Sequence, residues 1–270
     1  MGHQRLGKIP KSKLFSEVVG LITGAPGGGA GSSVSIVEDV ENIAAATLVA
    51  AQIGLDQAKN DAGLCDIFYL LTQLVLAARD EKNWRNRFAE LGITLSDDAG
   101  MFEFNSELHA AIQDRLSQRN AYSDISEIGR KSAVEAINSL AGPRAASLFG
   151  TGPDELRDAV GELSTKKGFA ELGRRFFAGV LKQYLNFYIS KETPNAVREG
   201  RLNGVDGLRD FESALERHCY QSARIVQEFC GDWYSKTEWR EGIDRQNTSR
   251  AVAFAIEKLQ RELAQQGGDQ

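Results

Sequence analysis

The residues that could carry out chemistry are few, and the best-defined pair is Ser164 and Lys167 in the sequence STKK. This SxxK spacing serves a nucleophilic serine in one class of hydrolases, whose chains also carry SDN and KTG motifs. Here the SD pair at 123–124 lacks the asparagine and precedes the serine, and the KT pair at 236–237 lacks the glycine. The spacing therefore indicates the N-terminal cap of a helix and not a nucleophile.

A glycine-rich segment, residues 20–35, reads GLITGAPGGGAGSSVS. Gly24 and Gly29 have the spacing of the phosphate-binding loop GxxxxGK[ST], in which the lysine reaches the phosphates and the hydroxyl binds magnesium. Ala30 and Gly31 occupy the places of those two residues. The strand and helix pattern of a dinucleotide site is also missing. We expect a flexible connection or a loop that a partner orders, with nucleotide binding as the alternative.

Cysteine and histidine are scattered along the chain. Cys65, Cys219 and Cys230 form no CxxC pair and are odd in number, which argues against a disulfide framework and a cysteine zinc site. His109 has no ExxH partner, and His218 would point about 100° away from Cys219 on a helix. We therefore predict no catalytic residue, no metal site and no cofactor. Free thiols are typical of a reducing compartment, so we predict a cytoplasmic protein.

Positive charge is concentrated in two stretches of a chain whose net charge is −5. Residues 1–13 carry +4 and residues 164–201 carry +5, so the remainder carries −14. Such stretches often bind acidic surfaces or nucleic acid, although a solvated face or pairing with the acidic helices is an alternative. The candidate partner-binding residues are Arg5, Lys8, Lys11, Lys13, Lys166, Lys167, Arg174, Arg175, Lys182, Arg198 and Arg201.

A long amphipathic helix near 168–190 is the element around which we expect the chain to fold. Its apolar side chains recur every three or four residues, the spacing of one helical face, and many are aromatic. Gly173 and Gly179 lie inside it, each costing up to about 1 kcal/mol relative to alanine, so close approach of a neighbouring helix is the expected compensation. The stripe comprises Phe169, Leu172, Phe176, Val180, Leu181, Tyr184 and Phe187 or Tyr188.

Apolar periodicity elsewhere also favours helices, so we predict an all-α or nearly all-α multi-helix bundle. The other expected helices are 34–58, 62–79, 82–91, 102–118, 124–141, 153–163, 211–233 and 249–265. An Asp124 to Glu127 capping box is expected to open one helix, and a long loop is expected at 191–207. The expected domains are a basic, Gly-rich arm (1–33), a helical domain (34–266) with two subdomains divided near 119–124, and a tail (267–270).

These features predict a binding protein in preference to an enzyme. No apolar run is long enough to span a membrane, so we expect no membrane span. The favoured function is a non-enzymatic helical interaction or assembly subunit, which binds a protein partner or associates with itself through the basic surface and the N-terminal arm. The alternative is a nucleic-acid-binding accessory factor. An enzyme whose site forms only in the fold is the least expected class.

Overall fold

The computed structural model describes residues 13–23, 39–145 and 152–266 of the chain. Within these ranges every regular element is a helix, so the predicted all-α class is confirmed. None of the helices described is long and apolar enough to cross a membrane. The glycine-rich residues 24–31 and the candidates Arg5, Lys8 and Lys11 lie outside the described ranges.

The helices follow one another along the chain with short connections. The first part contains α1 (Lys13–Thr23), α2 (Val40–Ala50), α3 (Gln52–Ala58), α4 (Ala62–Ala77), α5 (Trp84–Glu90), α6 (Met101–Gln118) and α7 (Asp124–Ala145). The second part contains α8 (Pro153–Gly161), a 3-10 turn η1 (Glu162–Ser164), α9 (Lys166–Ile189), α10 (Thr193–Arg198), α11 (Gly204–Ser222), α12 (Arg224–Arg240) and α13 (Arg245–Gln266).

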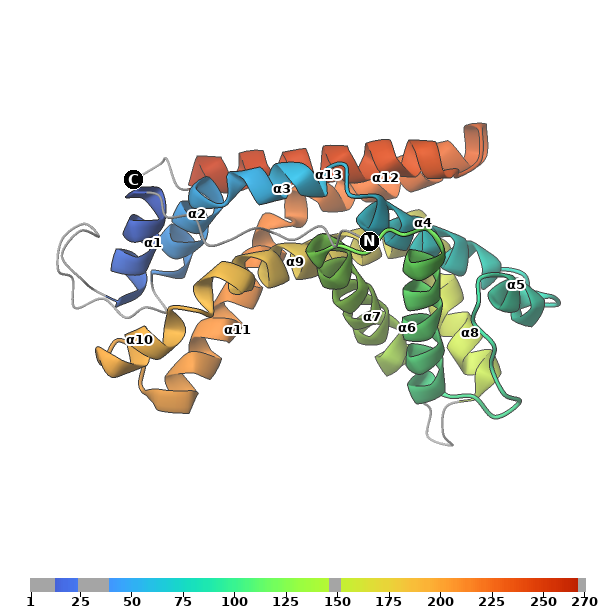
Figure 1. Ribbon diagram of the computed structural model, residues 1–270. Coiled ribbons are helices and arrows are strands. Elements are labelled where there is room, and N and C mark those ends of the chain that lie inside the picture. The colour runs from blue at the N-terminus through green and yellow to red at the C-terminus, as the bar shows by residue number, and fades with distance from the viewer. Residues whose placement is uncertain (1–12, 24–38, 146–151, 267–270) are drawn as a thin grey trace.

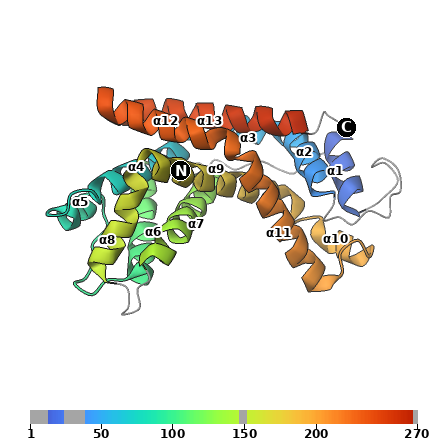
Figure 2. The same ribbon diagram turned by 180° about the vertical axis from the view of Figure 1, so that it is seen from behind.

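Two long helices, α12 and α13, lie side by side along one edge of the molecule, and α9 crosses next to them (Figures 1 and 2). From this layer α11 and α10 extend on one side, and α6, α7 and α8 extend on the other. Both α7 and α11 contact α9. The two groups diverge away from it, which leaves one face of α9 between them.

Helix α9 is buried along the predicted apolar stripe. Thr165 caps its N-terminus, with the hydroxyl oxygen accepting a hydrogen bond from Gly168 N at 3.0 Å. The cap is therefore Thr165, one residue after the predicted Ser164, whose hydroxyl donates to Gly161 O in the preceding turn at 2.6 Å. The buried residues of the stripe are Phe169, Leu172, Phe176, Val180, Leu181, Tyr184 and Tyr188.

The aromatic side chains of α9 form the centre of the core. Phe68 of α4 contacts the rings of Phe169, Phe176 and Phe177, with centroids 5.1 to 5.8 Å apart. Phe169 also stacks on Tyr234 of α12, with centroids 4.1 Å apart. Because these rings fill the interior, they are not available to stack on nucleic-acid bases.

The two glycines inside α9 lie where neighbouring helices come closest. A Cβ on Gly173 would lie 2.6 Å from both Cβ and Sγ of Cys230 on α12. A Cβ on Gly179 would lie 3.0 Å from Cβ and Oγ of Ser132 on α7. Close approach of neighbouring helices, which the sequence predicted, is confirmed at both positions.

Two predicted helices are divided in the structure. The helix expected at 34–58 breaks at Ala51, whose carbonyl oxygen accepts hydrogen bonds from the Tyr184 hydroxyl and from Gly54 N instead of continuing the α-helical pattern. The helix expected at 211–233 breaks at Ala223, which is fully buried. After this break α12 continues to Arg240, so the turn expected after Trp233 is helical.

The predicted loop at 191–207 is also shorter than expected. It contains α10, with Pro194 in its first turn, and α11 already begins at Gly204. Proline is favoured at the start of a helix because its missing N–H would have no partner there. Gly204 has a φ of 63°, which a glycine adopts without strain and other residues rarely adopt. Pro194 and Gly204 therefore mark helix starts, whereas Gly200 follows the end of α10.

Helix α1 lies within the segment that the sequence assigned to the N-terminal arm. Phe15, Val18 and Ile22 are buried, and α1 packs against α2. Arg201, which follows α10, donates a hydrogen bond to Leu21 O at 2.9 Å and pairs with Asp39 at 3.2 Å. Residues 13–23 of the arm are thus packed against the helical core.

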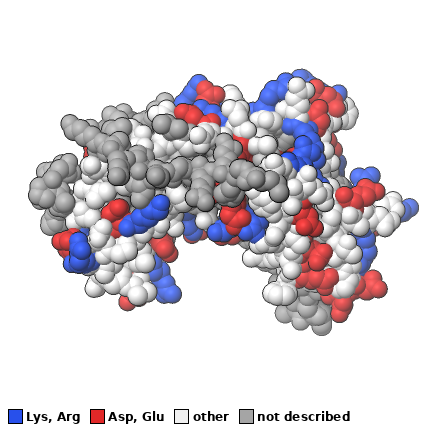
Figure 3. Space-filling view, in the orientation of Figure 1, with Lys and Arg blue, Asp and Glu red and all other residues white. Residues whose placement is uncertain are grey.

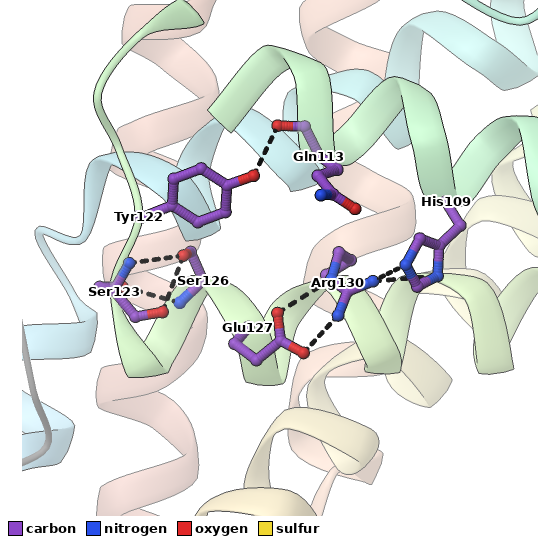
Figure 4. Close-up of polar contacts among 7 residues, drawn as sticks. All are labelled: His109, Gln113, Tyr122, Ser123, Ser126, Glu127 and Arg130. Atoms are coloured by element: carbon purple, nitrogen blue, oxygen red, sulfur yellow. Dashed lines mark hydrogen bonds and ion pairs between the residues drawn. The ribbon is translucent and has the colours of Figure 1, made fainter. Parts of the chain in front are cut away.

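Helix α7 begins with a reciprocal cap between two serines (Figure 4). The Ser123 hydroxyl accepts from Ser126 N, and the Ser126 hydroxyl accepts from Ser123 N, both at 2.8 Å. The capping box is therefore one residue earlier than the predicted Asp124 to Glu127 pair. Ser123 also donates to the buried carboxylate of Asp61 at 2.6 Å, which joins the starts of α7 and α4.

Candidate functional site

A groove lies between α7 and α11, with α9 as its floor, and encloses about 530 Å³. In the space-filling view the molecule is hollowed between the two groups of helices (Figure 3). We call it the central groove; its lining residues are Ser132, Glu135, Ala136, Asn138, Ser139, Arg175, Ala178, Gly179, Lys182, Glu216, Arg217 and Tyr220. Two of the predicted partner-binding residues, Arg175 and Lys182, are among them.

The floor of the central groove is set by the crossing of α7 and α9. Gly179 allows the backbone of Ser132 to approach, and the Ser132 hydroxyl is buried there without a hydrogen-bond partner among the described residues. From this crossing α7 diverges from α11, so polar side chains of three helices face one space. An unsatisfied buried hydroxyl is costly, and a polar atom of a bound partner could satisfy it.

Charges of both signs line the central groove. Lys182 of α9 pairs with Glu216 of α11 at 2.6 Å. Arg217 of α11 and Glu135 of α7 are exposed, and neither makes a hydrogen bond or ion pair with another described residue. The groove therefore offers one unpaired cation and one unpaired anion from opposite walls.

One end of the groove is closed by a polar network around Tyr220. The guanidinium carbons of Arg174 and Arg175 lie 3.8 and 5.1 Å from the centroid of its ring. Its hydroxyl donates to Glu171 at 2.6 Å, and Gln227 donates to the other oxygen of that carboxylate at 3.0 Å. Burial, followed by the hydrogen bond and charge of Glu171, raises the pKa of Tyr220. The network fixes α11 and α12 against α9.

The described candidate cations of α9 are mostly engaged within the chain. Arg174 donates to Tyr220 O at 3.0 Å, and Arg175 pairs with Glu171 at 3.3 Å. Lys166 pairs with Asp232 at 2.5 Å. Hydrogen bonds from Lys166 and Lys236 lower the pKa of Asp232 to about 2.

The remaining candidates are placed differently. Arg198 pairs with its neighbour Glu199 at 3.3 Å, and both are exposed. Arg201 is held by α1 and Asp39 as described above. Lys167 is exposed and has no hydrogen bond or ion pair with another described residue. Lys13 is the first residue of α1. The structure brings Arg175 and Lys182 together in the central groove, with Arg174 next to Arg175 over the ring of Tyr220. Among the other described candidates, Lys166, Lys167, Arg198 and Arg201 do not line this groove.

A second groove, of about 580 Å³, lies elsewhere between α7 and α9. Glu127 on its edge accepts a hydrogen bond from Arg130 at 3.0 Å, and Arg130 also contacts His109 of α6 (Figure 4). Burial and the charge of Arg130 lower the pKa of His109, so its imidazole is neutral near pH 7. The lining residues of this second groove are Tyr122, Asp124, Glu127, Ile128, Lys131, Gln183, Asn186, Phe187 and Ser190.

Neither groove contains an arrangement of nucleophile and base. Cys219 and Cys230 are buried, and burial raises the pKa of both thiols, which makes them poor nucleophiles. In the described part of the chain no three His, Cys, Asp or Glu residues lie close enough to hold a metal ion. The side chains that line the central groove can form hydrogen bonds and ion pairs.

Comparison of the chain with protein-family models, curated proteins and solved structures finds no match. Sequence reasoning missed Glu135, Ser132, Arg217 and Tyr220, which line the groove from α7 and α11. No local signal marks them, because each becomes part of a site only through the way two distant helices cross α9.

Proposed function

We propose that this protein is a non-enzymatic helical interaction or assembly subunit that binds a partner protein in the central groove. The observation that carries the proposal is the mixed charge of the groove. Lys182 is already matched by Glu216, while Arg217 and Glu135 remain unpaired. A partner helix or loop with charges of both signs complements such a surface, because unlike charges on opposite sides of an interface favour the correct register.

The same charges favour a protein over a nucleic acid. Nucleic-acid sites gather unpaired Lys and Arg side chains that replace the counterions of the phosphates. In this protein Lys166, Arg175 and Lys182 each have a carboxylate partner that a phosphate would have to displace. The basic residues 1–13 are proposed to add contacts to acidic groups of the partner.

The test is affinity purification of the tagged protein from its source, with nuclease treatment, followed by mass spectrometry of what remains bound. We expect a partner protein that is retained by the wild type and by Arg209→Glu, and lost with Arg217→Glu or Glu135→Lys. Arg209 is the matched control because it is an exposed arginine of α11 outside the groove.

The Arg217 and Glu135 substitutions leave the described ion pairs intact, so far-ultraviolet circular dichroism of both variants should match the wild type. Reversal of Arg174 would be less informative, because it would break contacts that hold α9 to α11. A partner that survives both groove substitutions would refute the proposed site. Loss of all binding after nuclease treatment would favour a nucleic-acid-binding factor.

A further inference from the structure

Two arginine side chains contact one carboxylate where α4, the end of α6 and the start of α13 meet, and a third arginine lies close to them. Asp66 of α4 is 6% exposed. Its Oδ2 lies 2.5 Å from Arg119 Nε of α6, and its Oδ1 contacts Arg245 of α13. The guanidinium of Arg245 also lies over the ring of Tyr69, at 4.9 Å from the centroid. We call Asp66 and the arginines at 115, 119 and 245 the arginine cluster.

The third arginine has no carboxylate of its own. Arg115 is one helical turn before Arg119 on α6, and it makes no hydrogen bond or ion pair with another described residue. Burial lowers the pKa of Arg115, and the positive charge of Arg245 and Arg119 lowers it further, while Asp66 acts in the opposite direction. The fold thus keeps a partly buried cation beside two others.

The charges of the arginine cluster do not balance. Arg119 and Arg245 contact the Asp66 carboxylate and Arg115 lies close to them, so these four side chains together carry an excess of two positive charges. Asp244, next to Arg245 in the sequence, is exposed; its carboxylate accepts Asn247 N at 2.7 Å at the start of α13 and makes no ion pair with a described arginine. Side chains of Arg119 and Arg245 remain 47% and 41% exposed, so their other N–H groups are open to a ligand.

We propose that the arginine cluster is a binding site for a phosphate group, with Asp66 holding two of the guanidinium groups in place and Arg115 completing the site. Each guanidinium has five N–H donors in a planar fork that matches two oxygens of a phosphate. Asp66 uses few of these donors. A doubly charged phosphate matches the excess charge, and charge-assisted hydrogen bonds to it are roughly twice as strong as neutral ones. Lys and Arg side chains gather in this part of the molecule in the space-filling view (Figure 3).

The test measures thermal unfolding of the full chain in sodium phosphate and in sodium chloride at equal ionic strength. Inorganic phosphate should raise the unfolding temperature, because a ligand that binds only the folded state stabilises it. Arg115→Gln should weaken phosphate binding by about tenfold to a hundredfold, the effect of losing hydrogen bonds to a charged group. Glycerol phosphate, used in parallel, distinguishes a site for free phosphate from one that accepts a phosphate ester.

Two further variants separate binding from a merely structural role. Arg250→Gln is the matched control, since Arg250 is an exposed residue of α13 outside the cluster, and it should respond to phosphate like the wild type. Arg115→Lys keeps the charge without the fork and should bind with intermediate affinity. In chloride, Arg115→Gln should be no less stable than the wild type, because it relieves repulsion. Equal responses of Arg115→Gln and the wild type to phosphate, or no response of either, would overturn the proposal.

Discussion

Replacement of Gly173 by alanine tests whether the crossing of α9 and α12 is as tight as the structure indicates. The added Cβ would lie 2.6 Å from Cβ and Sγ of Cys230, whereas ordinary contact begins at 3.4 Å, so the helices must separate by about 0.8 Å. Cys230 is 1% exposed, and its Cβ cannot rotate away. Overpacking of this kind costs about 1 to 3 kcal/mol. The higher helix propensity of alanine returns up to about 1 kcal/mol.

Subtracting this gain from the cost of overpacking leaves a net cost of about 0 to 2 kcal/mol, so we expect Gly173→Ala to lower the free energy of unfolding by about 1 kcal/mol. Urea unfolding followed by far-ultraviolet circular dichroism measures the change. Gly161→Ala is the control, because Gly161 is helical and its added Cβ would reach Ala78 O only at an ordinary 3.4 Å. This control should be neutral or stabilising by up to about 1 kcal/mol.

A double-mutant cycle tests whether the loss of stability in Gly173→Ala comes from contact with Cys230. With Cys230→Ala the sulfur is gone while its Cβ remains, so the cost of Gly173→Ala should shrink without vanishing. A coupling energy of about 0.5 kcal/mol or more is expected for residues in contact. The reasoning fails if Gly173→Ala stabilises the protein as much as Gly161→Ala does, since α9 and α12 would then have room for the methyl group.

Three further predictions concern single buried groups. Gly63→Ala should lower the free energy of unfolding by about 1 to 3 kcal/mol, because the added Cβ would overlap the carbonyl oxygen of Ala121. This oxygen belongs to the backbone and cannot move aside as a flexible side chain can. A urea unfolding curve that matches the wild type would contradict the prediction. Tyr184→Phe should cost about 1 to 2 kcal/mol in the same assay, because the carbonyl oxygen of Ala51 loses the donated hydroxyl; an unchanged midpoint would refute that. Burial lowers the pKa of His218 in the folded protein. As the pH drops below about 6.5, the ordinary pKa of histidine, the unfolded chain therefore binds a proton at this residue before the folded protein does, and the free energy of unfolding falls. His218→Gln should flatten the dependence of stability on pH between about pH 7 and pH 5, and an unchanged slope would show that other groups cause it.

Most of the longer helices of this protein could be predicted from local patterns because burial repeats along them, whereas α1 and α10 were not predicted. The buried stripe on α9 and the close approach of a neighbouring helix at Gly173 could both be predicted from the spacing of residues in the sequence. The positions where helices break could not be predicted from local patterns. The break at Ala51 depends on a hydrogen bond from Tyr184, a residue far along the chain.

The candidate sites were even harder to predict from local patterns, because they depend on contacts between distant helices. The charge of Lys182 was visible in the sequence, but its pairing with Glu216 depends on how α11 crosses α9. The arginine cluster also escapes sequence reasoning, because Arg119 and Arg245 are brought to Asp66 from two different helices. A sequence gives the number of charges, whereas the fold decides which of them are neutralised within the chain.

The docking of α1 has a consequence for how the protein should be handled. An isolated helix of this length is only marginally stable in water, so α1 depends on the surface that it covers. Because α1 belongs to the same chain as that surface, its effective concentration there is high. A chain shortened to begin at α2 would expose that surface. Such a chain is expected to self-associate through the uncovered apolar side chains, or to take up the helix of a second molecule by domain swapping. Expression and crystallisation work should therefore retain residues 13–23.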